Sequence, residues 1–434
     1  MMRLLLITGL LTGLLFLESQ ALTAQTPEPL SATVSPRSLS FDAFLAEVAQ
    51  NNLEYAAQRY NVSIAQAQVA QARVFPNPVL GAGGSRDFSG QDMPSSLGLS
   101  LTQTFLTAGK HRAGIEVAEG NYRVAGSTVE DFFRNLRAAA ANGFIDALTA
   151  QLIVQQKKLS AEALDRLVEA NEERLRAGDL AEIDVIQSRV EALQFHSELL
   201  AAEANLQTAV IALSQFLGKE SGSVTVRPEG RIEEILPKAF SLSELVEEAL
   251  QKRPDVVSAW HAREAARSGI KLAKANRIPD VDIGLSGQRN FASNNKIAPS
   301  PQFDLLGLSV SIPLPIFNTK RAELEIARLT SEQAEKNWQA VRLKTEIEVR
   351  QAYTRYQSAA ARVAKYKMGV LRDSTSVLEA KLYSYKRGHT SLLEVLNAQR
   401  EENTIHLAYY DTLTDYAKAL VTLEQASGIW DVKF

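Results

Sequence analysis

Cysteine and histidine, which often act as nucleophiles, bases or metal ligands, are absent or few in this chain. It has no cysteine and five histidines. The histidines are scattered without the spacing of a metal site, and they stand at His111, His196, His261, His389 and His406. The sequence contains no nucleophile elbow, phosphate-binding loop or zinc signature. We therefore expect no catalytic residue, no metal site and no cofactor, and we predict that the chain is not an enzyme.

The polar residues with the clearest pattern lie in a turn that occurs twice. Gly178 is followed by Asp179 in the first turn, and Gly388 is followed by His389 and Thr390 in the second. Glycine takes the left-handed conformation that ends a helix, and Asp179 or Thr390 can cap the helix that follows. Each turn therefore predicts a helix hairpin. Glycine turns are common, so this pattern alone does not indicate a function.

The two turns belong to a repeat that covers nearly the whole chain. Residues from about Ser40 to Gly218 reappear from Ser241 to Gly428. A repeat of this length predicts two copies of one structural unit in a single polypeptide. The expected division is an N-terminal extension at 25–39, repeat 1 at 40–218, a connector at 219–239, repeat 2 at 240–428 and a C-terminal tail at 429–434.

The first residues predict export. Met1-Met2-Arg3 and the apolar run Leu4 to Leu17 have the charged and hydrophobic regions of a secretory signal peptide, expected at residues 1–24. No other stretch approaches twenty consecutive apolar residues, so transmembrane helices are not expected. An exported chain without cysteine has neither disulfides nor a lipid-modified cysteine, and its stability must come from packing or oligomerisation.

The charge balance argues against nucleic-acid binding. The chain has 47 basic and 50 acidic residues and a formal net charge of −3. A nucleic-acid-binding chain usually carries a strong basic excess.

Each repeat has the same expected order of elements, namely a short helix, a second helix, a β-hairpin, a long helix and a return helix. In repeat 1 these are expected at 41–50, 55–73, 79–106, 110–177 and 181–217. In repeat 2 they are expected at 243–251, 256–276, 281–312, 321–387 and 391–427. The long stretches contain no proline, and about 65 helical residues would reach roughly 100 Å. Apolar residues on the return helix recur every seven positions, as Ile186, Leu193 and Leu200 do, which is typical of a coiled coil.

The hairpin strands alternate large apolar residues with small or polar ones. Leu97, Leu99 and Leu101, for example, alternate with Gly98, Ser100 and Thr102. A half-buried sheet covered by helices would give this pattern in a soluble protein. A tilted strand of about ten residues is also long enough to cross a bilayer. Four strands cannot close around a lumen, and unpaired edges cannot face lipid, so this second interpretation requires several chains to share one sheet.

Taken together, the duplication, hairpins, signal peptide and repeated turn resemble the TolC family of outer-membrane efflux proteins, over about residues 40 to 428. The resemblance implies a mainly α fold with a small β part. Three chains would form a twelve-stranded β-barrel in the outer membrane of a Gram-negative bacterium, continued by an α-helical barrel in the periplasm. It also implies a passive exit duct of a tripartite efflux pump, carrying metal ions or small toxic compounds. The implied partners are outer-membrane lipid, a periplasmic adaptor protein and an inner-membrane pump of the resistance-nodulation-division class.

The resemblance also assigns roles to residues of the turns. Asp184, Tyr385, Glu394 and Asn397 match the family's periplasmic aperture, and Gly178 and Gly388 lie in the hairpin turns that dock the adaptor. The family's second aperture acid is Asn397 in this chain, and an arginine that latches some members closed is Thr390. Without the resemblance, Asp184 and Glu394 would be interpreted as solvated carboxylates in the first turn of a helix.

The segments that join strands to helices indicate a branch of the family. Leu101-Thr-Gln-Thr-Phe105 with Ala108-Gly-Lys110, and Pro313 to Arg321, are similar to the branch serving heavy-metal pumps of the cobalt-zinc-cadmium type. Two alternatives stay open. A periplasmic adaptor would have one helix hairpin between β-rich domains. A soluble helical spacer would not require the two hairpins of alternating strands.

Overall fold

The structure is a computed structural model that describes residues 37–88, 92–219, 226–235, 237–297 and 299–431. These residues belong to the unit Pro36–Phe434. The expected signal peptide and most of the N-terminal extension lie outside the described residues, as do parts of the expected connector and C-terminal tail. Within the described ranges, none of the helices is long and apolar enough to cross a membrane.

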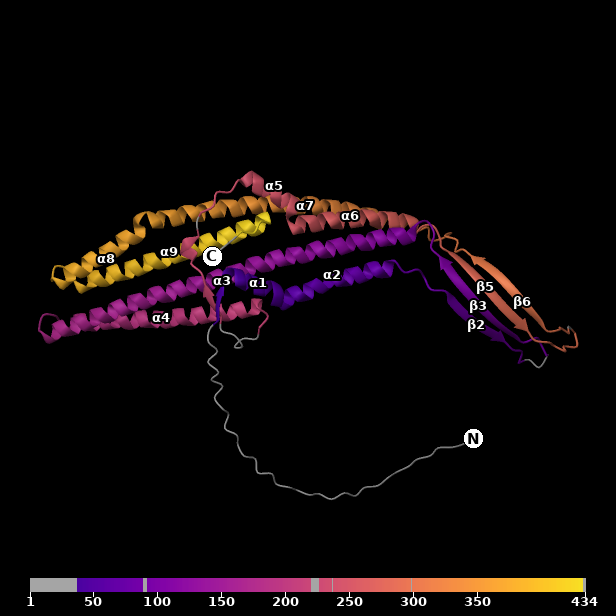
Figure 1. Cartoon of the computed structure of the whole chain (residues 1–434), viewed down its shortest axis with the longest axis horizontal. Coiled ribbons are helices and arrows are strands. Elements are labelled where there is room, and N and C mark those ends of the chain that lie inside the picture. The colour runs from indigo at the N-terminus through magenta and orange to yellow at the C-terminus, as the bar shows by residue number, and fades with distance from the viewer. Residues whose placement is uncertain (1–36, 89–91, 220–225, 236, 298, 432–434) are drawn as a thin grey trace, which may run out of the picture. The chain divides into compact units, whose positions relative to one another are not determined.

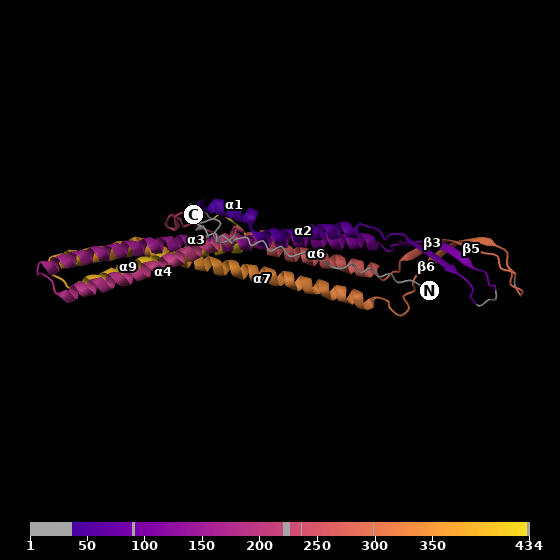
Figure 2. The ribbon, with the colours of Figure 1, turned by 90° about the horizontal axis from the view of Figure 1, so that it is seen from below.

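The helices follow the order of the two repeats. In the first repeat they are α1 (Phe41–Asn51), α2 (Leu53–Ala72), α3 (Lys110–Arg176) and α4 (Glu182–Phe216). In the second they are α5 (Leu242–Lys252), α6 (Pro254–Ala275), α7 (Arg321–Lys365), α8 (Leu371–Lys386) and α9 (Leu392–Ser427). Figures 1 and 2 show α3 beside α4, and Figure 1 shows α8 beside α9. These are two helix hairpins.

The second long helix differs from the sequence expectation. A continuous helix was expected over 321–387, but a π-helical turn, η2 (Tyr366–Val370), separates α7 from α8. Gly369 within it has φ 161° and ψ −20°, outside the helical region. Glycine weakens a helix interior because it lacks a side chain to restrict its backbone, and single π turns are tolerated inside long helices. The absence of proline from 321–387 therefore did not guarantee an unbroken helix.

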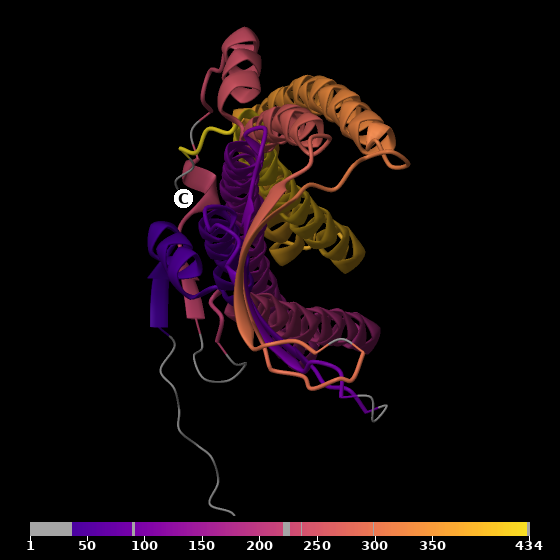
Figure 3. The same ribbon diagram turned by 90° about the vertical axis from the view of Figure 1, so that its right-hand side faces the viewer.

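Four strands form one antiparallel sheet in the order β2-β3-β5-β6. They are β2 (Val79–Ser85), β3 (Ser96–Phe105), β5 (Val281–Asn290) and β6 (Phe303–Ser311). Strand β3 of the first repeat pairs along its whole length with β5 of the second, so the two hairpins make a single sheet. Seen from its end, the sheet is curved (Figure 3).

The register gives the sheet two different faces. Leu80, Leu101, Leu285 and Leu308 are paired across the four strands and therefore form one apolar row. The next row, on the opposite face, consists of Gly81, Ser100, Ser286 and Gly307. Successive residues of a strand point to opposite faces, so one face is apolar and the other is small and polar. Among the described strands, β2 and β6 each have one edge without a partner.

A second, smaller sheet was not anticipated from the sequence. Strand β1 (Arg37–Ser40) pairs in parallel with β4 (Val226–Glu229), and a 3-10 turn, η1 (Ile232–Glu234), follows. Segments of four residues are too short for alternation to be recognised. This sheet lies beside the main core, where the ring of Phe144 on α3 lies 5.4 Å from Phe41 and 5.3 Å from Phe44 of α1.

In each repeat, a side chain from the start of the repeat caps the C-terminal end of the return helix. The Asn52 side chain donates a hydrogen bond to the Phe216 carbonyl at the end of α4 (3.1 Å), and Arg253 donates one to the Ala426 carbonyl near the end of α9 (3.0 Å). These carbonyls belong to the last helical turn, which has no partner within its own helix. Gly218, with φ 63°, follows α4, and a Cβ atom there would lie 2.2 Å from the Asn51 carbonyl oxygen. Glycine is therefore required at this close approach.

Candidate functional site at the helix hairpin turns

The turn between α3 and α4 and the turn between α8 and α9 have the same geometry. Gly178 and Gly388 are left-handed, with φ 83° and 73°. The N–H of the residue after each glycine bonds back to a helix carbonyl, Asp179 to Arg174 (2.9 Å) and His389 to Ser384 (3.0 Å). These bonds satisfy carbonyls that the end of a helix leaves free. Both turns lie at the end of the helices opposite the four-stranded sheet (Figure 1).

The capping expected for the second helix of each hairpin was wrong. The N-cap of α4 is Ala181, not Asp179, and it provides no side-chain hydrogen bond. The N-cap of α9 is Ser391, not Thr390, and its hydroxyl accepts from the N–H of Glu394 (3.4 Å). Each turn is thus longer than the sequence suggested, because Ala181 and Ser391 have extended backbone and the second helix begins only after them.

Glu394 has two partners within its own hairpin. Lys381 of α8 donates to Glu394 Oε2 at 2.5 Å, and the Thr390 hydroxyl donates to the same oxygen at 2.7 Å. The hydrogen bond from Lys381 lowers the pKa of the Glu394 carboxyl, and that from Thr390 adds to the effect. The carboxylate is therefore ionised at neutral pH, and its charge is compensated by Lys381.

Tyr385 joins the two hairpins. Its side chain is 5% exposed, and its hydroxyl donates to Oδ1 of the fully buried Asn171 on α3 at 2.9 Å. The Arg174 guanidinium lies 5.1 Å from the centre of the Tyr385 ring. Burial raises the pKa of Tyr385, and the charge of Asp184 acts in the same direction. Tyr385 of the second repeat is therefore held against Asn171 and Arg174 of the first.

Asn397 is exposed on α9, three residues after Glu394 and therefore on the same side of that helix. The structure thus brings Glu394 together with Thr390, and Tyr385 together with Asn171 and Arg174. Asp184 lies in the first turn of α4, and Asn397 lies one turn after Glu394 on α9.

Sequence reasoning missed several side chains of this region. Lys381, Asn171 and Arg174 are polar residues on long helices, where polar residues are ordinary. A further link between the hairpins is the bidentate pair of Arg400 on α9 with the buried Glu191 on α4, at 2.6 Å for the Nε–Oε1 contact. Bidentate arginine–carboxylate pairs are among the stronger polar contacts in proteins and fix the orientation of both side chains.

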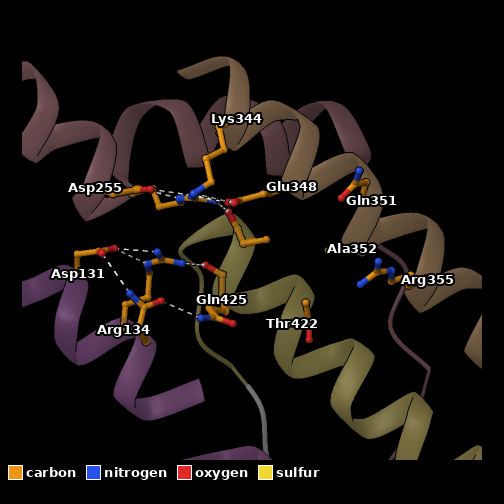
Figure 4. Close-up of a pocket in the computed structure, with 13 residues that line it drawn as sticks. Asp131, Arg134, Asp255, Lys344, Glu348, Gln351, Ala352, Arg355, Thr422 and Gln425 are labelled. Carbon is orange, nitrogen blue, oxygen red and sulfur yellow. Dashed lines mark hydrogen bonds and ion pairs between the residues drawn. The ribbon is translucent and has the colours of Figure 1, made fainter. Parts of the chain in front are cut away.

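A charged cavity elsewhere in the molecule is structural. It has a volume of about 390 Å³ and lies where α3, α7 and α9 meet (Figure 4). Arg253, which is 2% exposed, is bound there by Asp255 (2.7 Å) and Glu348 (2.6 Å), and Arg134 is bound by Asp131. These charges are paired with one another, as buried charges usually are. In the described ranges, no cluster of three or more His, Asp or Glu side chains could hold a metal ion.

Comparison with known proteins gives a consistent result. The family model described as outer membrane efflux protein matches residues 44–219 and 245–429. The cobalt-zinc-cadmium resistance protein CzcC of Cupriavidus metallidurans is 25% identical over 434 residues, which cover 99% of this chain and all of that protein. The outer membrane protein TolC of Escherichia coli is 22% identical over 81% of this chain and 74% of its own length.

Solved structures share the fold. A crystal structure of CusC superposes with a TM-score of 0.75 at 21% identity, covering 90% of this chain and 92% of that one. The open state of the MtrE outer membrane channel of Neisseria gonorrhoeae gives a TM-score of 0.73 at 18% identity, with coverage of 90% and 89%. These likenesses confirm the expected fold class.

Proposed function

Because this chain belongs to the outer membrane efflux protein family, we propose that three copies of it form one continuous exit duct. The chain is an outer-membrane channel of an efflux pump that extends into the periplasm, and not a periplasmic adaptor.

The four-stranded sheet is the observation that supports the trimer. Its outer strands β2 and β6 each leave one edge open within the described sheet. An open edge in a membrane leaves backbone N–H and C=O groups without partners, at a cost of several kcal/mol each. Pairing β6 of one copy with β2 of the next removes every open edge, and three copies would give a barrel of twelve strands. Closed rings of identical subunits are the common form of such assemblies.

The two faces of the sheet suit the two environments of such a barrel. The apolar row of Leu80, Leu101, Leu285 and Leu308 would face lipid. The opposite face carries glycine and serine, which are small and leave room for water along the lumen. A passive duct of this kind needs no catalytic group, so we propose that the chain is not an enzyme.

We assign the helix hairpin turns to the periplasmic end of the duct. Glu394, Tyr385, Asp184 and Asn397 would lie at or near its aperture. The contacts that support this assignment are the Lys381–Glu394 pair and the Tyr385–Asn171 hydrogen bond, which hold the second hairpin closed on itself and against the first. The exposed turns at Gly178 and Gly388 would dock a periplasmic adaptor, which connects the duct to an inner-membrane pump of the resistance-nodulation-division class.

Metal cations are the substrate class that the relatives favour. CzcC is named for cobalt, zinc and cadmium resistance and matches this chain over its full length. The cation efflux system protein CusC of Escherichia coli is 24% identical over 82% of this chain. Small toxic compounds are the second candidate, because the TolC proteins are also similar to the chain.

Deletion of the chain in its own host tests the proposal. We expect the deletion strain to be more sensitive to cobalt, zinc and cadmium, and to regain resistance when the chain is expressed again. Sensitivity to detergents and dyes with unchanged metal resistance would favour the second candidate. A stable monomer in detergent, measured by mass, would contradict the trimer.

A further inference from the structure

The link between β6 and α7 exposes an unusual set of apolar side chains. Leu314 is 74% exposed, Ile316 is 71% exposed and Phe317 is 100% exposed. The link is not slack, because the N–H of Ile316 bonds to the Leu314 carbonyl at 2.9 Å and prolines at 313 and 315 restrict the backbone. The chain thus holds three large apolar side chains away from its own core, where exposing them to water is unfavourable.

A basic cavity lies next to this link. It has a volume of about 440 Å³, and its lining includes Arg277, Arg321 and Arg328 with the single acid Glu325. Arg277 donates to the Thr319 carbonyl at 3.3 Å, which ties the cavity to the link. Arg328 contacts Glu325 at 3.4 Å. Three guanidinium groups against one carboxylate leave the cavity with a positive excess.

The position of the cavity indicates what neutralises that charge. The link lies where the sheet gives way to the helices (Figure 1). It continues β6, on which Leu308 and Val310 belong to the apolar face of the sheet. In an outer-membrane channel this boundary is the level of the periplasmic lipid headgroups. Arginine clusters at this level bind lipid phosphates, and apolar side chains beside them enter the acyl layer.

We propose that Arg277, Arg321 and Arg328, together with Leu314, Ile316 and Phe317, form a binding site for an anionic phospholipid of the periplasmic leaflet. The guanidinium groups bind the phosphate, and Phe317 and Ile316 insert among the acyl chains. The site anchors the barrel at a fixed depth. This inference rests on the proposed orientation of the channel, and its tests use the assembled protein.

The first test measures where Phe317 lies. Because the chain has no cysteine, Phe317→Cys carries a single thiol to which an environment-sensitive fluorophore can be attached. In vesicles whose lipids carry bromine on the acyl chains, we expect its fluorescence to be quenched. The control is Met368→Cys on the π turn, which is also highly exposed but lies among the helices, and we expect no quenching there. Absence of quenching at Phe317 would overturn the proposal and indicate that a neighbouring copy covers the link.

The second test measures the lipid preference. The trimer is released from vesicles of equal phosphatidylglycerol and phosphatidylcholine, and the retained lipids are counted by native mass spectrometry. We expect phosphatidylglycerol to be retained in preference, and the preference to fall at least about tenfold in Arg277→Gln/Arg321→Gln/Arg328→Gln. The matched control is Arg59→Gln/Arg166→Gln/Arg355→Gln, which removes the same charge from exposed helix positions. This variant should retain the preference for phosphatidylglycerol.

Conductance separates this inference from the proposed function. Both triple variants should form trimeric channels in planar bilayers. Channels with an unchanged lipid preference in the first triple variant would overturn the lipid site alone, whereas a wild-type chain that forms no channel would overturn the proposed function.

Discussion

Lys381 on α8 and Glu394 on α9 form an ion pair across their hairpin turn, with Nζ 2.5 Å from Oε2. Both side chains are about half exposed. The pair changes the charge expected at the proposed aperture. Three bare Glu394 carboxylates around a narrow opening would make its potential strongly negative, but three Lys381–Glu394 pairs carry little net charge.

Lys381→Gln should therefore make the channel more selective for cations. The substitution leaves Glu394 ionised without its cationic partner, so block by multivalent cations from the periplasmic side should need on the order of tenfold less blocker. Glu394→Gln should have the opposite effect and weaken the block. Planar-bilayer recordings measure both.

Two controls accompany this comparison. Lys386→Gln removes the same charge from an exposed position on α8, and Asp184→Asn removes a carboxylate from the equivalent turn of the first repeat. Both should change the block less than the Lys381 and Glu394 variants do. An unchanged block in Lys381→Gln and Glu394→Gln would place the pair away from the constriction.

The pH dependence of the same channel follows from the lowered pKa of Glu394. Its folded pKa lies below the ordinary value of 4.5, because it accepts hydrogen bonds from Lys381 and Thr390. The stabilisation from the pair is thus present above 4.5 and is lost as the pH falls through the lower, folded pKa. Ion selectivity should stay constant from neutral pH down to this range and change only below it. In Lys381→Gln the change should begin at a higher pH, and identical titrations of the two proteins would contradict the role of Lys381.

Tyr385→Phe should loosen the contact between the hairpins. It removes the only hydroxyl that bonds to Oδ1 of Asn171 in the described structure and leaves a buried acceptor without a partner, at a cost of about 1–3 kcal/mol. Thermal unfolding of the purified protein measures the loss. Tyr385→Phe/Asn171→Leu removes both partners and should recover part of the stability, because no polar group is then left unpaired. Additive losses in the double variant would show that the two side chains do not interact.

Arg253→Met should destabilise the junction of α7 and α9 more than any substitution at the turns. It removes the buried cation that Asp255 and Glu348 share, so that, among the described residues, Glu348 keeps only Lys344 at 3.6 Å, and it removes the hydrogen bond to the Ala426 carbonyl. Loss of one member of a buried charge cluster costs about 3 kcal/mol. The equivalent corner of the first repeat offers a milder comparison, since Asn52→Ala removes only neutral hydrogen bonds.

Local patterns predicted the elements well, and long-range pairings could not be predicted. Alternation along a strand and the position of glycine in a turn are set by neighbouring residues, so the hairpins and turns could be located in the sequence. The pairing of β3 with β5 joins segments about 180 residues apart, and no local pattern encodes it. The Tyr385–Asn171 contact is of the same kind.

The Lys381–Glu394 pair, in contrast, could have been predicted from the sequence. The two residues lie about equally far from Gly388, on either side of it, and such positions face one another across a helix hairpin. Opposite charges at these positions predict an ion pair once the hairpin is recognised. The resemblance to the family pointed instead to the position of Thr390, where some members carry an arginine.

The orientation of the channel can be tested by labelling single thiols on intact cells. Ile297 lies in the link between β5 and β6, at the end of the sheet away from the helices, and is 94% exposed. Leu393 lies at the start of α9, in the hairpin proposed to be periplasmic, and is also exposed. Ile297→Cys should therefore react with a membrane-impermeant thiol reagent on intact cells, whereas Leu393→Cys should react only after the outer membrane is broken. The wild-type chain has no cysteine and provides the background. Labelling of Leu393→Cys but not Ile297→Cys on intact cells would reverse the proposed topology, because the helix hairpins would then lie outside the cell and could not reach a periplasmic adaptor.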